Sequence, residues 1–189
     1  MLSPKRATVA RYGPPPHRPR LASAIQTKVA RLVDRWSQKH PAEPIVTRAD
    51  GTITIPASAA LVSRNAAVMP SFDSGQQLLH NGAWKGQPTA AAFEYRVTVP
   101  STRTMFLSVN FSTWHINEDL LLLPVNTSTK VQSVPVFYSV HNPGSWNMTR
   151  PVPVAMAAGQ NVLRFWRNSS RAMAIKAIVL EPTNRTALL

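Results

Sequence analysis

The chain contains no cysteine among its 189 residues. This absence excludes disulfide bonds, thiolate metal sites and a catalytic cysteine. Acidic residues are also scarce, since 8 Asp and Glu stand against 21 Lys and Arg, giving a formal net charge of +13. No segment approaches the roughly 18 uninterrupted apolar residues that a transmembrane helix needs. The sequence therefore predicts no membrane span.

Glycine is infrequent, with 7 residues, whereas proline is abundant, with 17. Frequent proline interrupts long helices, and a hydrophobic content of 44% is too high for a wholly disordered chain. A chain of this length can bury the core of one domain and still carry an appendage. We therefore expect a folded domain with few helices.

The basic residues are concentrated near the N-terminus. Seven Lys or Arg precede the first acidic residue, Asp34. Residues 1–70 hold 11 Lys and Arg against 3 acids, whereas residues 71–183 hold 9 against 5. This uneven distribution predicts a basic N-terminal arm attached to a mildly cationic globular part.

The predicted arm, residues 1–48, has two parts. Residues 1–20 include the triplet Pro14–Pro16, so we expect them to be extended. Residues 21–39 place apolar side chains at helical spacing and basic ones on another stripe, which predicts an amphipathic α-helix. The side chains expected to bind partners are Lys5, Arg6, Arg11, Arg18, Arg20, Lys28, Arg31, Arg35 and Trp36.

Between Trp146 and Pro182, apolar and polar residues alternate with a period of two. The alternation is broken at Gly159–Asn161 and at Asn168–Arg171, which have the composition of turns. Such a pattern predicts antiparallel strands with one buried face. The apolar positions of these strands are Val152, Val154, Met156, Leu163, Phe165, Ile175, Ala177 and Val179.

The order of these strands resembles the closing strands of the jelly-roll carbohydrate-binding modules, which are galactose-binding-like β-sandwiches appended to many polysaccharide-degrading enzymes. The resemblance rests on Trp146, the P-V-x-V of Pro151–Val154, the A-G-x-N-x-L-x-F of Ala158–Phe165 and the strand Ile175–Pro182. Four upstream segments fit in the same order: Asp50–Ala57, Gly75–Leu78, Phe93–Pro100 and Thr104–Phe111.

The resemblance covers residues 49–183 and implies an all-β, antiparallel jelly-roll β-sandwich. Residues 184–189 would then form a C-terminal tail. Alternation within the upstream segments places further side chains in the core. These are Phe93, Tyr95, Val97, Val99, Leu107 and Val109.

Modules of this family hold sugars with loop aromatics, because aromatic faces stack on the C–H faces of pyranose rings. The resemblance implies Trp84 and Trp166 as vestigial sugar-binding residues, and Trp146 as a structural residue under the closing strands. Trp166 is expected to be exposed, since it lies beside Arg164 and Arg167.

The family's calcium site draws on acids of the opening strand, but Ile53–Ser58 has none. We therefore expect the sandwich to bind neither calcium nor oligosaccharides.

Residues suited to catalysis are few. The cluster His115–Asp119 matches no metal-binding spacing and is interpreted as a polar turn. Gly144–Trp146 is not a nucleophile elbow, and Gly82–Gly86 lacks the length of a phosphate-binding loop. We expect no catalytic residue, no cofactor and no metal ion, and hence no enzyme.

These observations predict a non-catalytic structural or accessory subunit of a large mitochondrial assembly, anchored by its arm to other protein subunits. The acid-poor, Arg-rich N-terminus is typical of mitochondrial import and indicates the matrix side. A respiratory-chain or ATP-synthase complex is slightly favoured. The alternatives are a mitochondrial ribosomal protein with the arm on rRNA, a carbohydrate-binding module and a viral coat protein. RNA or anionic lipid head groups are the alternative partners of the arm.

Overall fold

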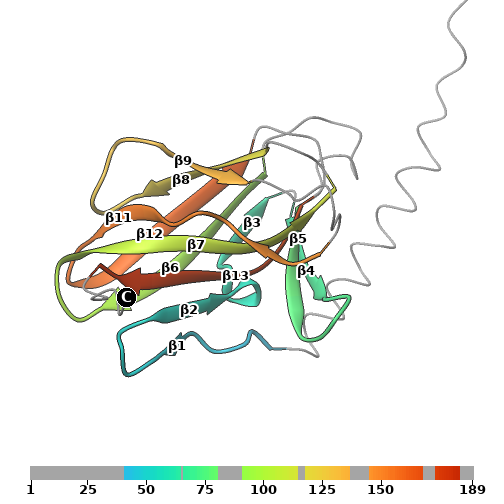
Figure 1. Cartoon of the computed structure of the whole chain (residues 1–189), viewed down its shortest axis with the longest axis horizontal. Helices are drawn as coiled ribbons and strands as arrows, with labels where there is room; N and C mark the ends of the chain where they lie inside the picture. The colour runs from blue at the N-terminus through green and yellow to red at the C-terminus, as the bar shows by residue number, and fades with distance from the viewer. Residues whose placement is uncertain are drawn as a thin grey trace, which may run out of the picture.

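The computed structural model describes residues 41–64, 66–80, 91–114, 118–136, 145–167 and 173–183. These residues form two antiparallel β-sheets that pack face to face (Figure 1). The all-β, antiparallel jelly-roll sandwich expected from the sequence is therefore confirmed. Residues 1–40 of the predicted arm, which include the helix expected at residues 21–39, lie outside the described residues, so the arm and its helix stay predictions, as does the division of the chain at residues 48 and 183.

The first sheet is built around the last strand of the chain. It consists of β1 (Val46–Thr47), β2 (Ile53–Pro56), β4 (Ala66–Pro70), β5 (Gln76–His80), β7 (Arg103–Thr113), β10 (Asn147–Met148), β11 (Val152–Met156) and β13 (Met173–Pro182). β13 pairs with β7 on one side and with β2 and β5 on the other. β1 extends the sheet from β2, β4 extends it from β5, and β10 and β11 both pair with β7.

The second sheet has five strands in the order β3-β6-β12-β8-β9. Their bounds are β3 (Val62–Arg64), β6 (Ala91–Val99), β8 (Glu118–Pro124), β9 (Gln132–Val136) and β12 (Gly159–Arg167). A single 3-10 turn, η1 (Ala57–Ala59), joins β2 of the first sheet to β3 of the second. The chain thus changes sheets within a few residues.

The core between the sheets contains the side chains that alternation predicted. Phe93, Tyr95, Val97, Val99, Leu107, Val109, Leu163, Phe165 and Ile175 are all buried. At its centre, Phe165 stacks on Phe93 with ring centroids 5.3 Å apart, and Tyr95 meets Phe165 edge-on at 6.1 Å. Burial raises the pKa of the Tyr95 phenol, whose hydroxyl donates to the carbonyl oxygen of Ala57 at 3.3 Å. The period-two prediction for these strands is confirmed.

The alternation predicted for the last strand fails halfway along β13. A β-bulge lies between Ile175 and Ala177, so that Ile175 faces Phe111 while Ala177 faces the next residue of β7, Asn110. The extra residue, Lys176, shifts the alternation by one position. Consequently Ile178 and Leu180 are buried, whereas Ala177 and Val179 are only half-buried.

Arg167 occupies a different environment from the one expected. It follows Leu163 and Phe165 at a spacing of two and points inward, where its guanidinium is fully buried and forms an ion pair with Glu118. A buried charge needs such a partner, because an unpaired ion in the interior is costly. Trp166, on the opposite face, is half-buried rather than exposed.

Candidate functional site

Two aromatic rings from distant parts of the chain stack on each other at the surface of the first sheet. The ring centroids of Phe72 and Trp146 lie 5.0 Å apart, and the ring planes are inclined by only 6°. Phe72 remains 64% exposed, whereas Trp146 is half-buried. We call this pair the aromatic platform. It presents one face of a supported ring to solvent.

The register of the first sheet explains why these residues meet. Asn147 of β10, Phe111 of β7, Ile175 of β13 and Leu78 of β5 form one row across four strands. Trp146 directly precedes this row. The loop carrying Phe72 leads into β5 at the end of the same row. Strand pairing therefore brings together residues that lie 74 positions apart in the chain.

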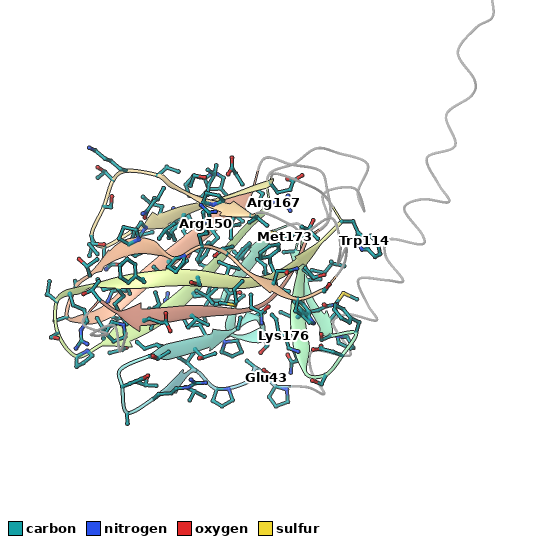
Figure 2. The ribbon with its side chains drawn as sticks, in the orientation of Figure 1. Glu43, Trp114, Arg150, Arg167, Met173 and Lys176 are labelled. Atoms are coloured by element: carbon teal, nitrogen blue, oxygen red, sulfur yellow. The ribbon has the colours of Figure 1, made fainter. Side chains whose placement is uncertain are left out.

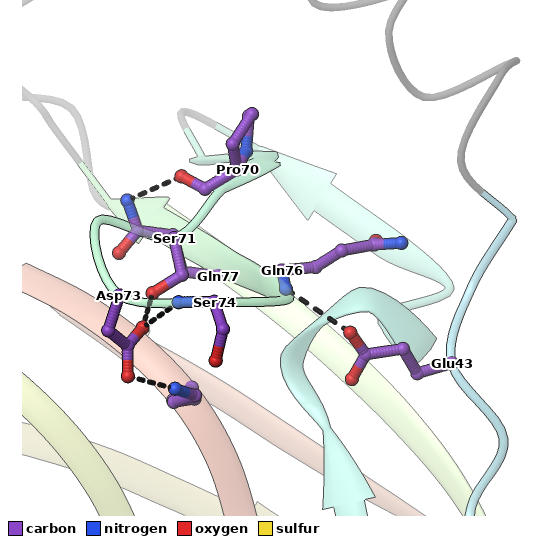
Figure 3. A network of polar contacts seen from close by, with 8 residues as sticks. Glu43, Pro70, Ser71, Asp73, Ser74, Gln76 and Gln77 are labelled. Carbon is purple, nitrogen blue, oxygen red and sulfur yellow. Dashed lines mark hydrogen bonds and ion pairs between the residues drawn. The ribbon is translucent and has the colours of Figure 1, made fainter.

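The loop Ser71–Gly75 is closed by its own hydrogen bonds (Figure 3). The Ser71 amide donates to the Gly75 carbonyl oxygen at 3.0 Å. The Asp73 carboxylate accepts from the Ser74 amide at 2.7 Å and from the Ser71 hydroxyl. Gly75 has φ +70°, a left-handed conformation that favours glycine. These contacts fix the backbone on both sides of Phe72.

The bulge in β13 places Lys176 where it can contact both halves of the site. Its ammonium group forms an ion pair with Asp73 and lies 5.4 Å from the ring centroid of Trp146. Hydrogen bonds from Lys176, Ser71 and the Ser74 amide, in that order, hold the pKa of Asp73 well below its usual range. Asp73 is therefore ionised at neutral pH, and the pair joins the loop to the centre of the sheet.

Trp146 also carries an unused hydrogen-bond donor. Its indole Nε1 is buried and has no hydrogen-bond partner among the described residues. Leaving a buried donor unpaired costs about 1–3 kcal/mol, so an unpaired donor of this kind in a folded protein calls for an explanation. With the Lys176 ammonium and the Asp73 carboxylate beside it, the platform combines an aromatic face with a hydrogen-bond donor and a hydrogen-bond acceptor.

The first described residues of the chain are attached beside the platform. The side-chain amide of Gln76 donates to the Pro41 carbonyl oxygen at 2.9 Å, and the Gln76 backbone amide donates to Glu43 Oε1 at 3.2 Å. The Glu43 amide in turn donates to the Ser58 hydroxyl at 3.0 Å. Since Gln76 directly follows the loop Ser71–Gly75, Glu43 is hydrogen-bonded to the start of β5 at the end of that loop (Figure 3).

The residues proposed from sequence lie elsewhere or outside the described part. Trp84 and all the arm residues from Lys5 to Trp36 are outside it. Trp166 belongs to the second sheet, opposite Leu121 of β8 and Ala92 of β6, and is not part of the platform. Another tryptophan, Trp114, is 69% exposed and projects from one end of the sandwich (Figure 2).

Three members of the site, Phe72, Asp73 and Lys176, were missed by sequence reasoning. Phe72 lies in a loop, where no alternation marks it. Lys176 was assigned to an ordinary strand position, because the bulge that redirects it depends on pairing with β7. The one available signal was the Asp73-Ser74-Gly75 sequence, whose residue types favour a tight turn.

Other parts of the described structure offer less for binding or catalysis. No group of three or more His, Asp or Glu side chains lies close enough together to hold a metal ion in the segments described. Of the predicted polar turn, Glu118 pairs with Arg167, and Asp119 accepts from the Ser133 hydroxyl at 3.0 Å. A pocket of about 310 Å³ between Asp50 and Arg103 has no aromatic lining. No helix in the described segments is long and apolar enough to cross a membrane.

Several solved structures with the same fold are carbohydrate-binding modules. CBM35 from Paenibacillus barcinonensis is 17% identical with a TM-score of 0.56, and the match covers 69% of this chain and 98% of that one. CBM6cm-2 from Cellvibrio mixtus lichenase 5A, solved with cellotriose, is 13% identical with a TM-score of 0.54, over 69% and 96% of the chains. The CBM6 of a laminarinase from Zobellia galactanivorans is 14% identical with a TM-score of 0.54, over 69% and 98%.

No family model matches the sequence, and the comparison with curated proteins also found no match. At identities this low, the structural likeness establishes the fold. The resemblance to the galactose-binding-like, jelly-roll carbohydrate-binding modules is thereby confirmed at the level of the fold.

The comparisons contradict the main functional prediction, a subunit of a mitochondrial respiratory or ATP-synthase complex. They give no support to the respiratory or ribosomal assignments. That prediction relied on the charge of the arm, whereas the sandwich described here lies within residues 41–183, and after residue 40 the 7 acids offset much of the charge of 12 Lys and Arg. The similar solved structures favour one of the alternatives named in the sequence analysis, a carbohydrate-binding module.

Proposed function

We propose that residues 41–183 act as a non-catalytic carbohydrate-binding module and that the aromatic platform is the binding site. The observation that carries this proposal is the exposed face of Phe72, held flat by its stack on Trp146. Sugar sites pair an apolar surface with a few polar groups that fix orientation. The platform has both, on a fold shared with sugar-binding modules.

In this proposal, the pyranose ring lies against Phe72 while its hydroxyl groups meet the surrounding polar groups. The Asp73 carboxylate accepts hydrogen bonds, and the Lys176 ammonium donates them. The ion pair of Asp73 with Lys176 keeps these side chains in place before the sugar arrives, which lowers the entropy lost on binding. This proposal reverses the expectation that the sandwich binds no oligosaccharide.

A glycan array probed with the full chain tests the proposal and identifies the sugar. Alanine substitutions then locate the site. Phe72→Ala should weaken binding by about two- to twelve-fold or more, the loss expected from an aromatic contact of about 0.5–1.5 kcal/mol. Trp114→Ala and Trp84→Ala test two other aromatic positions.

The matched control is Phe106→Ala, because Phe106 is a partly exposed aromatic of the same sheet, in β7. It should leave affinity unchanged. If binding is lost in Trp84→Ala or Trp114→Ala and kept in Phe72→Ala, the proposed function as a carbohydrate-binding module stands, but the sugar-binding site is not the aromatic platform. Absence of binding to every glycan would overturn the proposed function itself.

A further inference from the structure

The outer face of the first sheet continues beyond the aromatic platform. Trp146 directly precedes β10, and Met148 is the second residue of that strand. Side chains two positions apart in a strand point to the same face and lie roughly 6.6–6.8 Å apart. Met148 pairs with Asn110 of β7, so its side chain and that of Asn110 lie beside each other on the face that carries Trp146.

Met148 and Asn110 are accessible, and their chemistry suits a sugar. The Met148 side chain is 51% exposed, and Asn110 is half-buried. Met148 offers an apolar surface to the C–H groups of a sugar ring, whereas the Asn110 amide can both donate and accept hydrogen bonds with hydroxyl groups. On the other side of Asn110 lies Ala177, whose single methyl group leaves space beside the amide.

The bulge in β13 connects Met148 and Asn110 to the platform. Its extra residue, Lys176, directly precedes Ala177, which faces Asn110. The Lys176 ammonium also lies 5.4 Å from the ring centroid of Trp146. The two parts of this face are therefore linked twice, once along the chain from Trp146 to Met148 and once through Lys176.

We propose that the ligand is a linear polysaccharide, of which two consecutive sugar residues are bound on this face. One sugar stacks on Phe72, and the next contacts Met148 through its ring and Asn110 through its hydroxyl groups. This inference rests on the proposed function, because it names the ligand class of the same site. The second contact is an intramolecular event once the first has formed, so the two together bind more tightly than either alone.

Titration of the full chain with sugars of increasing length tests the inference. The probes are glucose, cellobiose and cellotetraose, and mannose, mannobiose and mannotetraose. If the glycan array selects another sugar, the same three lengths of that sugar are used. We expect the affinity to rise about fourfold or more from the monosaccharide to the disaccharide, which is the effect of covering about one CH₂ group.

Variants separate the second contact from the platform. Met148→Ala should weaken binding of the disaccharide and the tetrasaccharide by about fourfold and leave the affinity for the monosaccharide unchanged. Asn110→Ala should have the same selectivity, with a loss of about two- to twelve-fold for one hydrogen bond. Phe72→Ala should weaken binding of all three lengths.

The matched control for Met148→Ala is Val131→Ala. Val131 is exposed to a similar extent, 52%, but directly precedes β9 of the second sheet. This substitution should change no affinity. Circular dichroism should show the wild-type spectrum for every variant, because the substituted side chains are exposed or half-buried.

Several outcomes would overturn the inference. Equal affinity for all three lengths would leave the platform as a site for a single sugar. A loss in Met148→Ala that is the same for every length would show an effect on Trp146 and no second sugar contact. A gain with length that persists in both Met148→Ala and Asn110→Ala would place the second contact elsewhere. In each of these cases the proposed function stands, whereas absence of binding to every glycan removes it as well.

Discussion

Truncation of Phe165 gives the sharpest test of how the two sheets are packed. Phe165 is fully buried, stacks on Phe93 at 5.3 Å and meets Tyr95 edge-on at 6.1 Å. Phe165→Ala removes a ring from a site whose neighbours are held by strands on both sides, so the cavity cannot collapse fully. We expect a loss of about 3–5 kcal/mol in the free energy of unfolding.

The neighbouring residue supplies the control. Trp166 lies on the opposite face of β12 and is only half-buried, so Trp166→Ala should cost less than Phe165→Ala despite removing a larger side chain. Urea denaturation followed by far-UV circular dichroism measures both. A loss of 3–5 kcal/mol would also lower the melting temperature by roughly 10–20 °C for a domain of this size.

The order of the two effects decides the outcome. If Trp166→Ala were the more destabilising, β12 would be shifted by one residue, because a shift of one exchanges every side chain between the faces. If both changes cost less than about 0.5 kcal/mol, typical of surface positions, the core would be placed wrongly. Should Phe165→Ala not fold, Phe165→Leu keeps most of the volume and preserves the comparison.

Three further changes test the site and its support. Lys176→Met should raise the pKa of Asp73 towards the usual value of about 3.9, as measured by NMR titration. Because the pKa of Asp73 is lowered in the folded state, the ion pair stabilises the fold above about pH 4, and this stabilisation is lost only as the pH falls through the lowered pKa. An unchanged pKa in the variant would show that the ion pair does not form. Gly75→Ala and Gly159→Ala should each cost about 1–2 kcal/mol, the cost of a left-handed backbone conformation for a residue with a Cβ, because the Glu43 carboxylate that would lie 2.9 Å from the new Cβ at Gly75 is the end of a flexible side chain and can move aside; thermal unfolding measures both losses, and a neutral result at both positions would refute the positive φ. Thr149→Val should cost about 1–3 kcal/mol because it leaves the Val109 amide, now 2.9 Å from the Thr149 hydroxyl, unpaired; thermal unfolding measures this, and a neutral result would refute the bond.

Much of the sandwich was predictable because its strands obey a local rule. Alternation alone identified the buried side chains of β6, β7 and β12, from Phe93 to Phe165, since neighbouring residues of a strand must face opposite sides. The same rule would have placed Arg167 inside, in phase with Phe165. It was assigned to the polar face on its residue type, and only the structure reveals Glu118 as its partner.

The candidate site was much less predictable, because it depends on contacts between distant segments. The stack of Phe72 on Trp146 joins a loop to the start of β10, and neither residue carries a periodic signal. Lys176 reaches Asp73 only because of the bulge, and the bulge depends on how β13 pairs with β7. The sequence therefore drew attention to Trp84 and Trp166, the tryptophans that looked exposed in a linear reading.

The central claim, that the aromatic platform binds a carbohydrate, is tested most directly by calorimetric titration of the full chain with the glycan that the array selects. The account predicts saturable binding by the wild-type chain, the same affinity in Phe106→Ala, and an affinity reduced about two- to twelve-fold or more in Phe72→Ala. All three proteins should unfold at similar temperatures, because Phe72 and Phe106 are exposed. Equal affinity of Phe72→Ala and the wild-type chain would contradict the claim.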